Sequence, residues 1–267
     1  LNIKVLFTER LGISSSFGAN HISLIVAIAM YIILHNYLID RKKGNIIKLL
    51  WLAFIIFLTG SRKGIFMVAF GFTFLIYTLY PKKRLRNILI GTLLTSVMFL
   101  LIMNIPILYN IIGSRVEELL KYLNIKETSE YSLRDRLFFI DIGWKYFLER
   151  PWTGYGLDCF KMLPESKGRY SHNNFIELLF SGGIIAFSIY YICYIISIFK
   201  CRLAYKSNNS IVGLMFTIII SMLLIDYGYV AYYDRIRLIV WVMVVAYTEI
   251  ASKSADTDSY GGRLWLK

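Results

Sequence analysis

Cysteine and histidine are scarce in this sequence, and neither residue type occurs at the spacing of a metal-binding motif. The cysteines are Cys159, Cys193 and Cys201. This odd count, with two cysteines in or beside one hydrophobic run, gives neither a disulfide framework nor a metal-binding spacing. The histidines also lack a metal-ligand spacing, so we predict no metal and no other cofactor. Gly154 and Gly156 do not begin a dinucleotide fingerprint, because Cys159 stands where the third glycine is needed.

Charged residues are also few, at 18%, whereas 57% of the 267 residues are hydrophobic. A soluble domain of this size is about 45–50% apolar. Several apolar runs are long enough to cross a hydrocarbon core of about 30 Å. They do not alternate like the strands of a membrane barrel, and helices satisfy their own backbone hydrogen bonds. We therefore predict an all-α polytopic membrane protein.

We predict about seven transmembrane helices in this chain, plus a large helical extracytoplasmic loop. The helices cover approximately residues 20–39, 46–60, 64–80, 88–109, 175–199, 211–224 and 236–250. The chain then divides into an extracytoplasmic N-terminal segment (1–19), helices one to four (20–109), the extracytoplasmic loop (110–174), helices five to seven (175–250) and a disordered cytoplasmic tail (251–267).

Acidic residues are outnumbered by basic ones, which gives a net charge of +13. In a soluble protein this excess would suggest nucleic-acid binding. Here basic clusters at 41–43, 82–86 and 200–206 fall in alternate loops, so we assign them to the cytoplasmic side and predict no nucleic-acid partner. The N-terminus then lies outside. Because the sequence starts at Leu1, without a signal-peptide pattern, we expect it to be part of a longer protein.

One segment of the long loop has helical periodicity. Between residues 132 and 150, Leu137, Ile140, Trp144 and Phe147 recur at steps of three and four. This spacing predicts an amphipathic helix, which could lie along the membrane surface or cover a lipid-binding groove. The following proline ends the helix, because the residue before a proline avoids the α region.

Arg62 lies in a short turn between two predicted spans, on the external side, where the positive-inside tendency disfavours it. A snorkelling interfacial arginine would explain this position. The alternative is an anion site, because a guanidinium binds phosphate oxygens bidentately and stays charged.

His172 follows Ser171, which we expect to cap the fifth span. A histidine at a helix start can be no more than a solvated polar end. The alternative is a general base at the membrane surface, because imidazole titrates near neutrality.

Other polar residues could support such sites. They are Arg10, Arg134, Arg136, Arg169, Asn173, Asn174 and Glu177. Arg134 and Arg136 flank Asp135, which favours charge pairing within the loop. Asp226 and Asp234 could line a sugar site together with neighbouring tyrosines, although an interfacial aromatic belt explains the tyrosines equally well.

Several motifs, taken in order, resemble the O-antigen ligase and O-antigen polymerase superfamily of bacterial membrane glycosyltransferases. The sequence from Pro151 to Gly156 resembles the family's Pro-x-x-Gly-x-Gly turn, and 171–183 resembles its His-Asn motif followed by a glycine pair. Residues 59–64 resemble its Ser-Arg-Gly turn, and 10–20 its Arg-x-Gly and Pro-Asn motif. The chain departs from the pattern at two positions, Ala19 and Ala186, where proline and glycine are expected.

The resemblance implies transfer of a glycan from a polyprenyl-diphosphate carrier to an acceptor hydroxyl, with inversion and without a metal or nucleotide sugar. It places the active site on the extracytoplasmic face of the bacterial inner (cytoplasmic) membrane. It implies Arg62 as the diphosphate-binding residue and His172 as the base. Further candidates for binding diphosphate or sugar are Arg10, Arg134, Arg136, Arg169, Asn173 and Glu177. The implied partners are the carrier-linked donor, a glycan or lipid-core acceptor, membrane lipid, and a chain-length regulator or other export proteins.

Three alternatives stay open at this point. A composition rich in Ile, Lys, Asn and Tyr is typical of AT-rich genomes, many of whose bacteria lack an outer membrane and make capsule or exopolysaccharide. This favours a polymerase over a ligase that acts on a lipid core. A transporter or flippase would often show internal repeats and ionisable residues within its spans, and we find no repeat and few such charges. A non-catalytic scaffold would need neither Arg62 nor His172.

Overall fold

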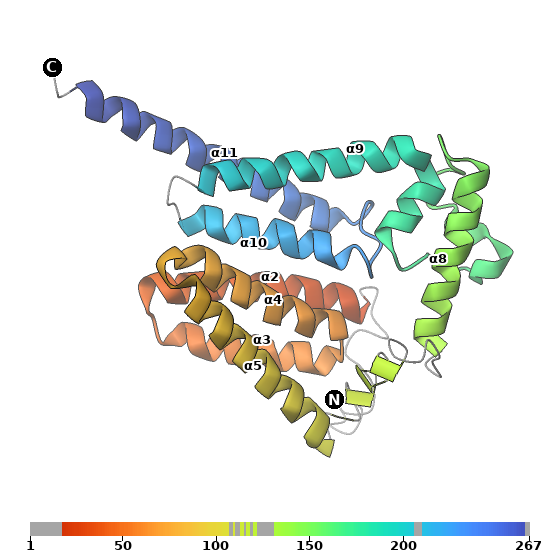
Figure 1. Ribbon diagram of the computed structural model, residues 1–267, viewed down its shortest axis with the longest axis horizontal. Helices are drawn as coiled ribbons and strands as arrows, with labels where there is room; N and C mark the ends of the chain where they lie inside the picture. Colours follow the sequence, from red (N-terminus) through yellow and green to blue (C-terminus); the bar gives the residue numbers. More distant parts are fainter. Residues whose placement is uncertain are drawn as a thin grey trace. The chain divides into compact units, whose positions relative to one another are not determined.

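The computed structural model describes residues 18–106, 131–205 and 210–264, with a few more between 109 and 121 (Figure 1). The described residues form helices and no strands, which confirms the all-α prediction. The chain divides into two compact units, Leu1–Tyr131 and Ser132–Lys267.

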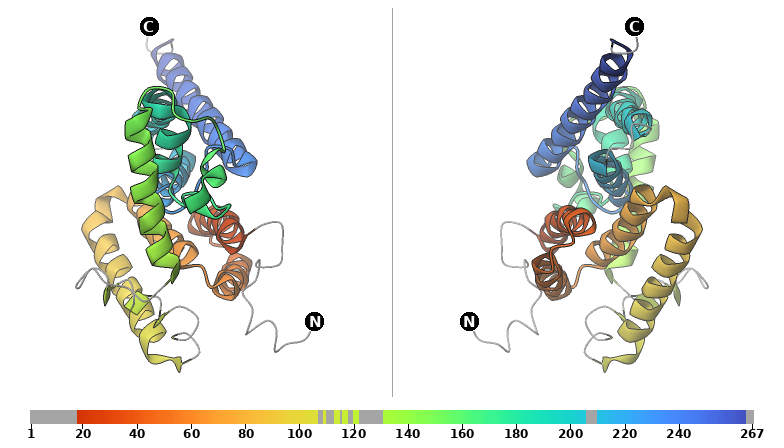
Figure 2. Two further views of the ribbon diagram at one scale, coloured as in Figure 1. Left: turned by 90° about the vertical axis from the view of Figure 1, so that its right-hand side faces the viewer. Right: turned by 90° about the vertical axis from the view of Figure 1, so that its left-hand side faces the viewer.

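The described residues of unit 1 form four long helices. They are α2 (Ala19–Asp40), α3 (Gly44–Thr59), α4 (Arg62–Leu79) and α5 (Arg84–Asn104), with a short 3₁₀ turn at Pro81–Lys83. Helix α2 packs against both α3 and α4, and α4 also contacts α5 (Figure 2). Small residues allow close approach of α2 and α4: the Tyr31 ring lies over Gly71, and its hydroxyl donates to the Met67 carbonyl at 2.5 Å.

Unit 2 contains α8 (Tyr131–Glu149), α9 (Asn174–Ala204), α10 (Ser210–Ile225) and α11 (Arg235–Leu264), with 3₁₀ turns at Phe160–Met162 and Pro164–Ser166. Helices α9, α10 and α11 pack against one another. A separate cluster of Phe139, Phe160 and Phe180 joins α8 to the first part of α9. The amphipathic helix predicted for residues 132–150 is therefore present as α8.

Each of the seven predicted spans overlaps one helix, namely α2, α3, α4, α5, α9, α10 or α11. Among the described residues, α2, α4 and α9 are long and apolar enough to cross a membrane, and α3 and α10 are shorter apolar helices. These helix lengths fit an α-helical membrane protein. That the chain has seven spans stays a prediction.

Three helix ends differ from the sequence prediction. Arg62 is the first residue of α4 rather than part of a turn, because Ser61 already caps that helix. Helix α9 is capped by Asn173 rather than Ser171. Helix α11 continues to Leu264, whereas we predicted a span ending at residue 250 and a disordered tail from 251. No proline interrupts the sequence after 250, so nothing local forces the helix to end there.

Helix α9 breaks at Gly183, where the backbone leaves the helical region with φ 61° and ψ −165° (Figure 1). The break frees backbone groups, and the turn after α8 satisfies them. The bonds are Tyr155 N–H to Phe180 C=O at 3.0 Å, Gly156 N–H to Ser181 C=O at 2.8 Å, and Ile184 N–H to Pro151 C=O at 2.8 Å. The Pro-x-x-Gly-x-Gly turn thus packs against the glycine pair at the break in α9.

We expect Gly183→Ala to destabilise the protein by about 3 kcal/mol or more. Its backbone conformation is essentially restricted to glycine, and an added Cβ would lie 2.3 Å from the Trp152 carbonyl oxygen. Gly168→Ala is the matched control, because Gly168 also has a positive φ, of 74°, but an added Cβ there would meet open space. It should cost about 1–2 kcal/mol. Thermal unfolding in detergent measures both, and equal losses would contradict the close-packing explanation.

Candidate functional site

The start of α9 holds His172 in a well-defined loop. Asn173 caps the helix, since its Oδ1 accepts from the N–H groups of Phe175 at 3.0 Å and Ile176 at 3.2 Å. The Ser171 hydroxyl donates to the Asn173 carbonyl at 2.8 Å. Between these two residues His172 has φ 59°, in the left-handed region that histidine tolerates better than most residues. Its backbone is therefore held from both sides.

Two aromatic rings lie next to the His172 side chain. The Tyr170 ring lies 4.3 Å away between centroids, and the Phe139 ring from α8 lies 6.4 Å away and nearly parallel to the imidazole. Burial raises the pKa of Tyr170, whereas the positive charge of Arg136 lowers it, so Arg136 of α8 is close to this phenol. The half-buried imidazole therefore lies beside two aromatic rings that limit its orientation.

Glu177 lies one turn into α9 and is fully buried. One carboxylate oxygen, Oε2, accepts from the Ser171 N–H at 2.7 Å. The other, Oε1, has no hydrogen-bond partner among the described residues, so one acceptor remains next to the His172 loop. In this structure Glu177 supports the loop backbone, and its direct binding of substrate stays a prediction.

The three arginines of unit 2 that were predicted to bind diphosphate or sugar differ in their surroundings. Arg169 pairs with Asp135 of α8 through Nη1 and Oδ2 at 2.6 Å, so Asp135 has a partner that sequence proximity did not suggest. Arg134 is exposed and Arg136 half-buried on α8. The structure thus brings Arg136 and Arg169 to the same loop as His172, while Arg134 lies on an exposed part of α8.

Asn174, the first residue of α9, ties the start of this helix to the loop between α10 and α11. Its Oδ1 accepts from the backbone N–H groups of Ala231 at 2.7 Å and Tyr232 at 3.0 Å. Its Nδ2 donates to the Tyr191 hydroxyl at 3.0 Å and to Asp226 Oδ2 at 3.4 Å. The backbone N–H of Asn174 also donates to the Asp226 carbonyl at 2.8 Å. One side chain therefore uses its whole hydrogen-bonding capacity directly beside His172 and Asn173.

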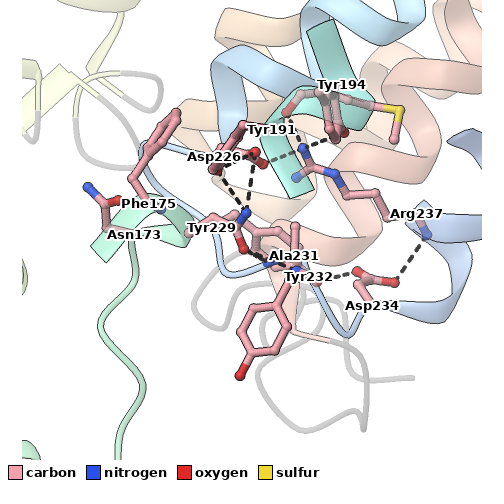
Figure 3. Close-up of polar contacts among 12 residues, drawn as sticks. Asn173, Phe175, Tyr191, Tyr194, Asp226, Tyr229, Ala231, Tyr232, Asp234 and Arg237 are labelled. Carbon is pink, nitrogen blue, oxygen red and sulfur yellow. Dashed lines mark hydrogen bonds and ion pairs between the residues drawn. The ribbon is translucent and has the colours of Figure 1, made fainter. Parts of the chain in front are cut away.

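Asp226, which accepts a hydrogen bond from Asn174, also forms a buried ion pair with Arg237 of α11 (Figure 3). Asp226 is 0% exposed and Arg237 2%. Arg237 also donates to the Tyr194 hydroxyl at 3.1 Å and to the Met222 carbonyl. Burial raises the pKa of Asp226, whereas the Arg237 guanidinium and the hydrogen bonds from Tyr191 and Asn174 lower it, so these partners favour the charged carboxylate.

The sequence left open that Asp226 and Asp234 could line a sugar site, but the structure buries both carboxylates. Asp234 caps α11 by accepting from the Ile236 N–H at 3.0 Å, and it accepts from the Tyr229 hydroxyl at 2.5 Å. Sequence reasoning missed the role of Arg237. The available signal was an arginine near the start of an apolar helix, a position that calls for a buried partner.

In unit 1, a network of small polar residues holds the turn before α4. Ser61 is the helix cap, because its Oγ accepts from the Gly64 N–H at 3.3 Å. The same hydroxyl donates to Asn20 Oδ1 at 3.0 Å and accepts from Ser23 Oγ at 3.1 Å. Asn20 and Ser23 belong to α2, so this network fixes the beginning of α4 against α2.

Arg62 and Lys63 occupy the first turn of α4, which contains no acidic residue. A helix N-terminus carries partial positive charge, so two cations there add to the dipole instead of balancing it. Both side chains are half-buried. The result is a concentration of positive charge on a rigid turn, which would stabilise a bound anion. Arg10 lies outside the described residues.

The described residues contain no group of three or more His, Cys, Asp or Glu side chains that could hold a metal ion. That the reaction needs no metal stays a prediction.

Two comparisons with known proteins bear on this site. A family model described as O-antigen ligase matches residues 47–191, slightly more than half of the chain. The matched range begins in α3 and ends in α9, so it includes the start of α4 at Arg62 and the His172 loop. No curated protein matches the chain.

Proposed function

Because the chain belongs to the O-antigen ligase family, we propose that it transfers a glycan from a polyprenyl-diphosphate carrier to a sugar hydroxyl of an acceptor. The observation that carries the proposal is that the family match includes both a cationic helix start at Arg62 and a histidine held at a helix start, His172. Such a reaction needs a stabilised diphosphate and a positioned base. We favour chain polymerisation in the synthesis of a surface polysaccharide, on the outer face of the cytoplasmic membrane.

The proposed reaction is an inverting displacement. The acceptor oxygen forms a bond to the anomeric carbon while the bond from that carbon to the diphosphate oxygen breaks. His172 accepts the proton of the attacking hydroxyl. The diphosphate leaves with the electron pair of the broken bond, and no electron donor or acceptor is needed.

Arg62 and Lys63 would stabilise the charge that develops on the leaving diphosphate. A guanidinium binds two phosphate oxygens at once, and the helix N-terminus adds to its field. Stabilisation of developing charge is commonly the largest contribution to catalysis. The Ser61 network supports this role, because it fixes the backbone that carries both cations.

The test is a transfer assay with the full-length protein and a polyprenyl-diphosphate-linked oligosaccharide. Products that grow by whole repeat units would support a polymerase. Transfer of an intact glycan to a separate lipid-core acceptor would identify a ligase. If the protein neither extends nor transfers the glycan, the proposal is wrong, and transport of the carrier-linked glycan should be measured.

We expect Arg62→Ala to lower kcat/KM by about 10²–10³-fold, because one charge-stabilising donor is lost. Arg62→Lys should recover part of the activity, since it restores the charge but not the bidentate fork. Arg86→Ala is the matched control, because Arg86 is an exposed cation in the first turn of α5. Its activity should stay close to that of wild type. Equal losses in the Arg62 and Arg86 variants would contradict a specific role for Arg62.

A further inference from the structure

Three segments that are far apart in the sequence of unit 2 meet near the start of α9. Asp158 follows the Pro-x-x-Gly-x-Gly turn, and its backbone N–H donates to the Tyr232 hydroxyl at 2.9 Å. The Tyr232 N–H in turn donates to Asn174 Oδ1 of α9 at 3.0 Å. The Gly156 N–H donates to the Ser181 carbonyl at 2.8 Å. Hydrogen bonds therefore fix the loop between α8 and α9, the first turns of α9, and the connection between α10 and α11 to one another.

Two buried oxygens of α9 lie next to this junction. Glu177 is 0% and Ser181 1% exposed, and neither Glu177 Oε1 nor Ser181 Oγ makes a hydrogen bond of normal geometry among the described residues. Burial raises the pKa of Tyr232, whereas the Asp158 N–H and the neighbouring Ser181 hydroxyl lower it. Burial and the negative charge of Glu177 raise the pKa of Tyr233. The two oxygens thus lie near the tyrosine pair, and buried oxygens without a partner call for an explanation.

The other side of the junction is accessible to solvent. The rings of Tyr232 and Tyr233 are 4.8 Å apart between centroids, and Tyr233 is 45% exposed. The Asp158 side chain is 49% exposed; its Oδ2 pairs with Lys161, and its Oδ1 makes no hydrogen bond within the described part of the chain. Because the Tyr232 oxygen accepts from the Asp158 N–H, its own proton can be donated to another group. The junction therefore combines unused acceptors, an unused donor and two aromatic rings.

These groups complement a neutral ligand that is rich in hydroxyl groups. The two carboxylates, Asp158 and Glu177, would repel a diphosphate. A sugar offers O–H donors to carboxylates, oxygens to phenols, and apolar C–H faces to aromatic rings. A few placed polar groups beside aromatic side chains are typical of small-molecule sites. A sugar hydroxyl that reached Glu177 Oε1, directly or through one water, would also satisfy the buried acceptor.

We propose that this junction binds the sugar that receives the glycan, and we call it the acceptor subsite. Its residues are Asp158, Glu177, Tyr232 and Tyr233. The inference rests on the proposed function and adds which residues select the acceptor. Glu177 Oε2 accepts from the Ser171 N–H, directly before the proposed base His172. Because the base must reach the attacking hydroxyl, a sugar bound beside this loop is the acceptor.

The first test measures sugar binding without turnover. The probe is the lipid-free repeat-unit oligosaccharide released from the carrier-linked donor, because chain growth by repeat units makes this glycan the acceptor. Wild-type protein in detergent should bind it saturably in saturation-transfer NMR. Asp158→Asn with Tyr233→Phe should raise its Kd about tenfold or more, since a charged acceptor and a hydroxyl are lost. Asparagine tolerates the φ of 61° at position 158, and phenylalanine keeps the ring.

The matched control is Glu165→Gln with Tyr227→Phe. It removes an exposed carboxylate and an exposed phenol hydroxyl from the same two connecting segments, and Glu165 accepts from Tyr146 of α8 instead. The Kd of this variant should equal that of wild type. Either equal changes in the two double variants or the lack of saturable binding to wild type would overturn the inference.

The second test separates this inference from the proposed function. In the transfer assay, the same oligosaccharide is the varied acceptor at saturating donor. The variant with Asp158→Asn and Tyr233→Phe should raise KM for the acceptor about tenfold, whereas KM for the donor should stay close to that of wild type. If wild type binds the oligosaccharide but transfers no glycan, the proposed function fails and the junction remains a sugar site. If wild type transfers glycan and the variant keeps the wild-type KM for the acceptor, the inference fails while the function stands.

Discussion

Replacing His172 with asparagine should lower kcat by about 10²–10⁴-fold, the usual contribution of a positioned general base. Asparagine is the better test than alanine, because the backbone at 172 has φ 59° and asparagine adopts this region readily. The substitution therefore removes the base while keeping the loop. KM for the carrier-linked donor should change little, since we assign donor binding to Arg62.

The control for this experiment is His21→Asn, at the start of α2 in unit 1. It removes the same group from another helix start and should keep most of the activity. A correctly folded His172→Asn protein with wild-type kcat would show that His172 is not the base. Glu177 would then be the next candidate, because it is the carboxylate that supports this loop.

The helices and the family were predictable from sequence because the signals are local. Long apolar runs separated by basic clusters place α2 to α5 and α9 to α11, and the period of three and four residues places α8. The resemblance carried by the Arg62 turn and the His172 motif is confirmed by the family match.

Ser171 was predicted to cap α9, which is wrong by two residues. The reason is local, and the sequence does not reveal it. Ser171 and Asn173 are both good capping residues, and both precede the same apolar run. In the structure the Ser171 hydroxyl bonds the Asn173 carbonyl, which leaves the Asn173 side chain to cap the helix. His172, which lies between the two residues, adopts the left-handed conformation.

The contacts around Asn174 were not predictable, because they join residues far apart in sequence. Asn174 bonds Asp226 and Ala231, more than fifty positions later. Asp226 in turn pairs with Arg237 across the connection between α10 and α11. The stretch of aspartates and tyrosines in this connection suggested a surface for sugars, whereas its acidic groups are used to hold the helices together.

This ion pair leads to the largest expected effect on stability. Asp226→Asn should destabilise unit 2 by about 3–5 kcal/mol, because the Arg237 guanidinium would remain buried without a counter-charge. Arg237→Met should cost a comparable amount by leaving the carboxylate unpaired. The double variant removes both charges, so we expect it to lose clearly less than the sum of the two single variants. Thermal unfolding of purified protein in one detergent measures all four members of this cycle.

The exposed pair of Asp158 and Lys161 is the matched control, since both side chains are about half exposed. Its double-mutant cycle should give about 0–1 kcal/mol. If the Asp226–Arg237 cycle gave an equally small value, the buried pair would not hold the helices together. Asn174 provides the link to function, because it bonds both Asp226 and the loop that follows it. Asp226→Asn should therefore lower kcat even at temperatures where the protein remains folded, since the start of α9, and His172 with it, loses one of its anchors.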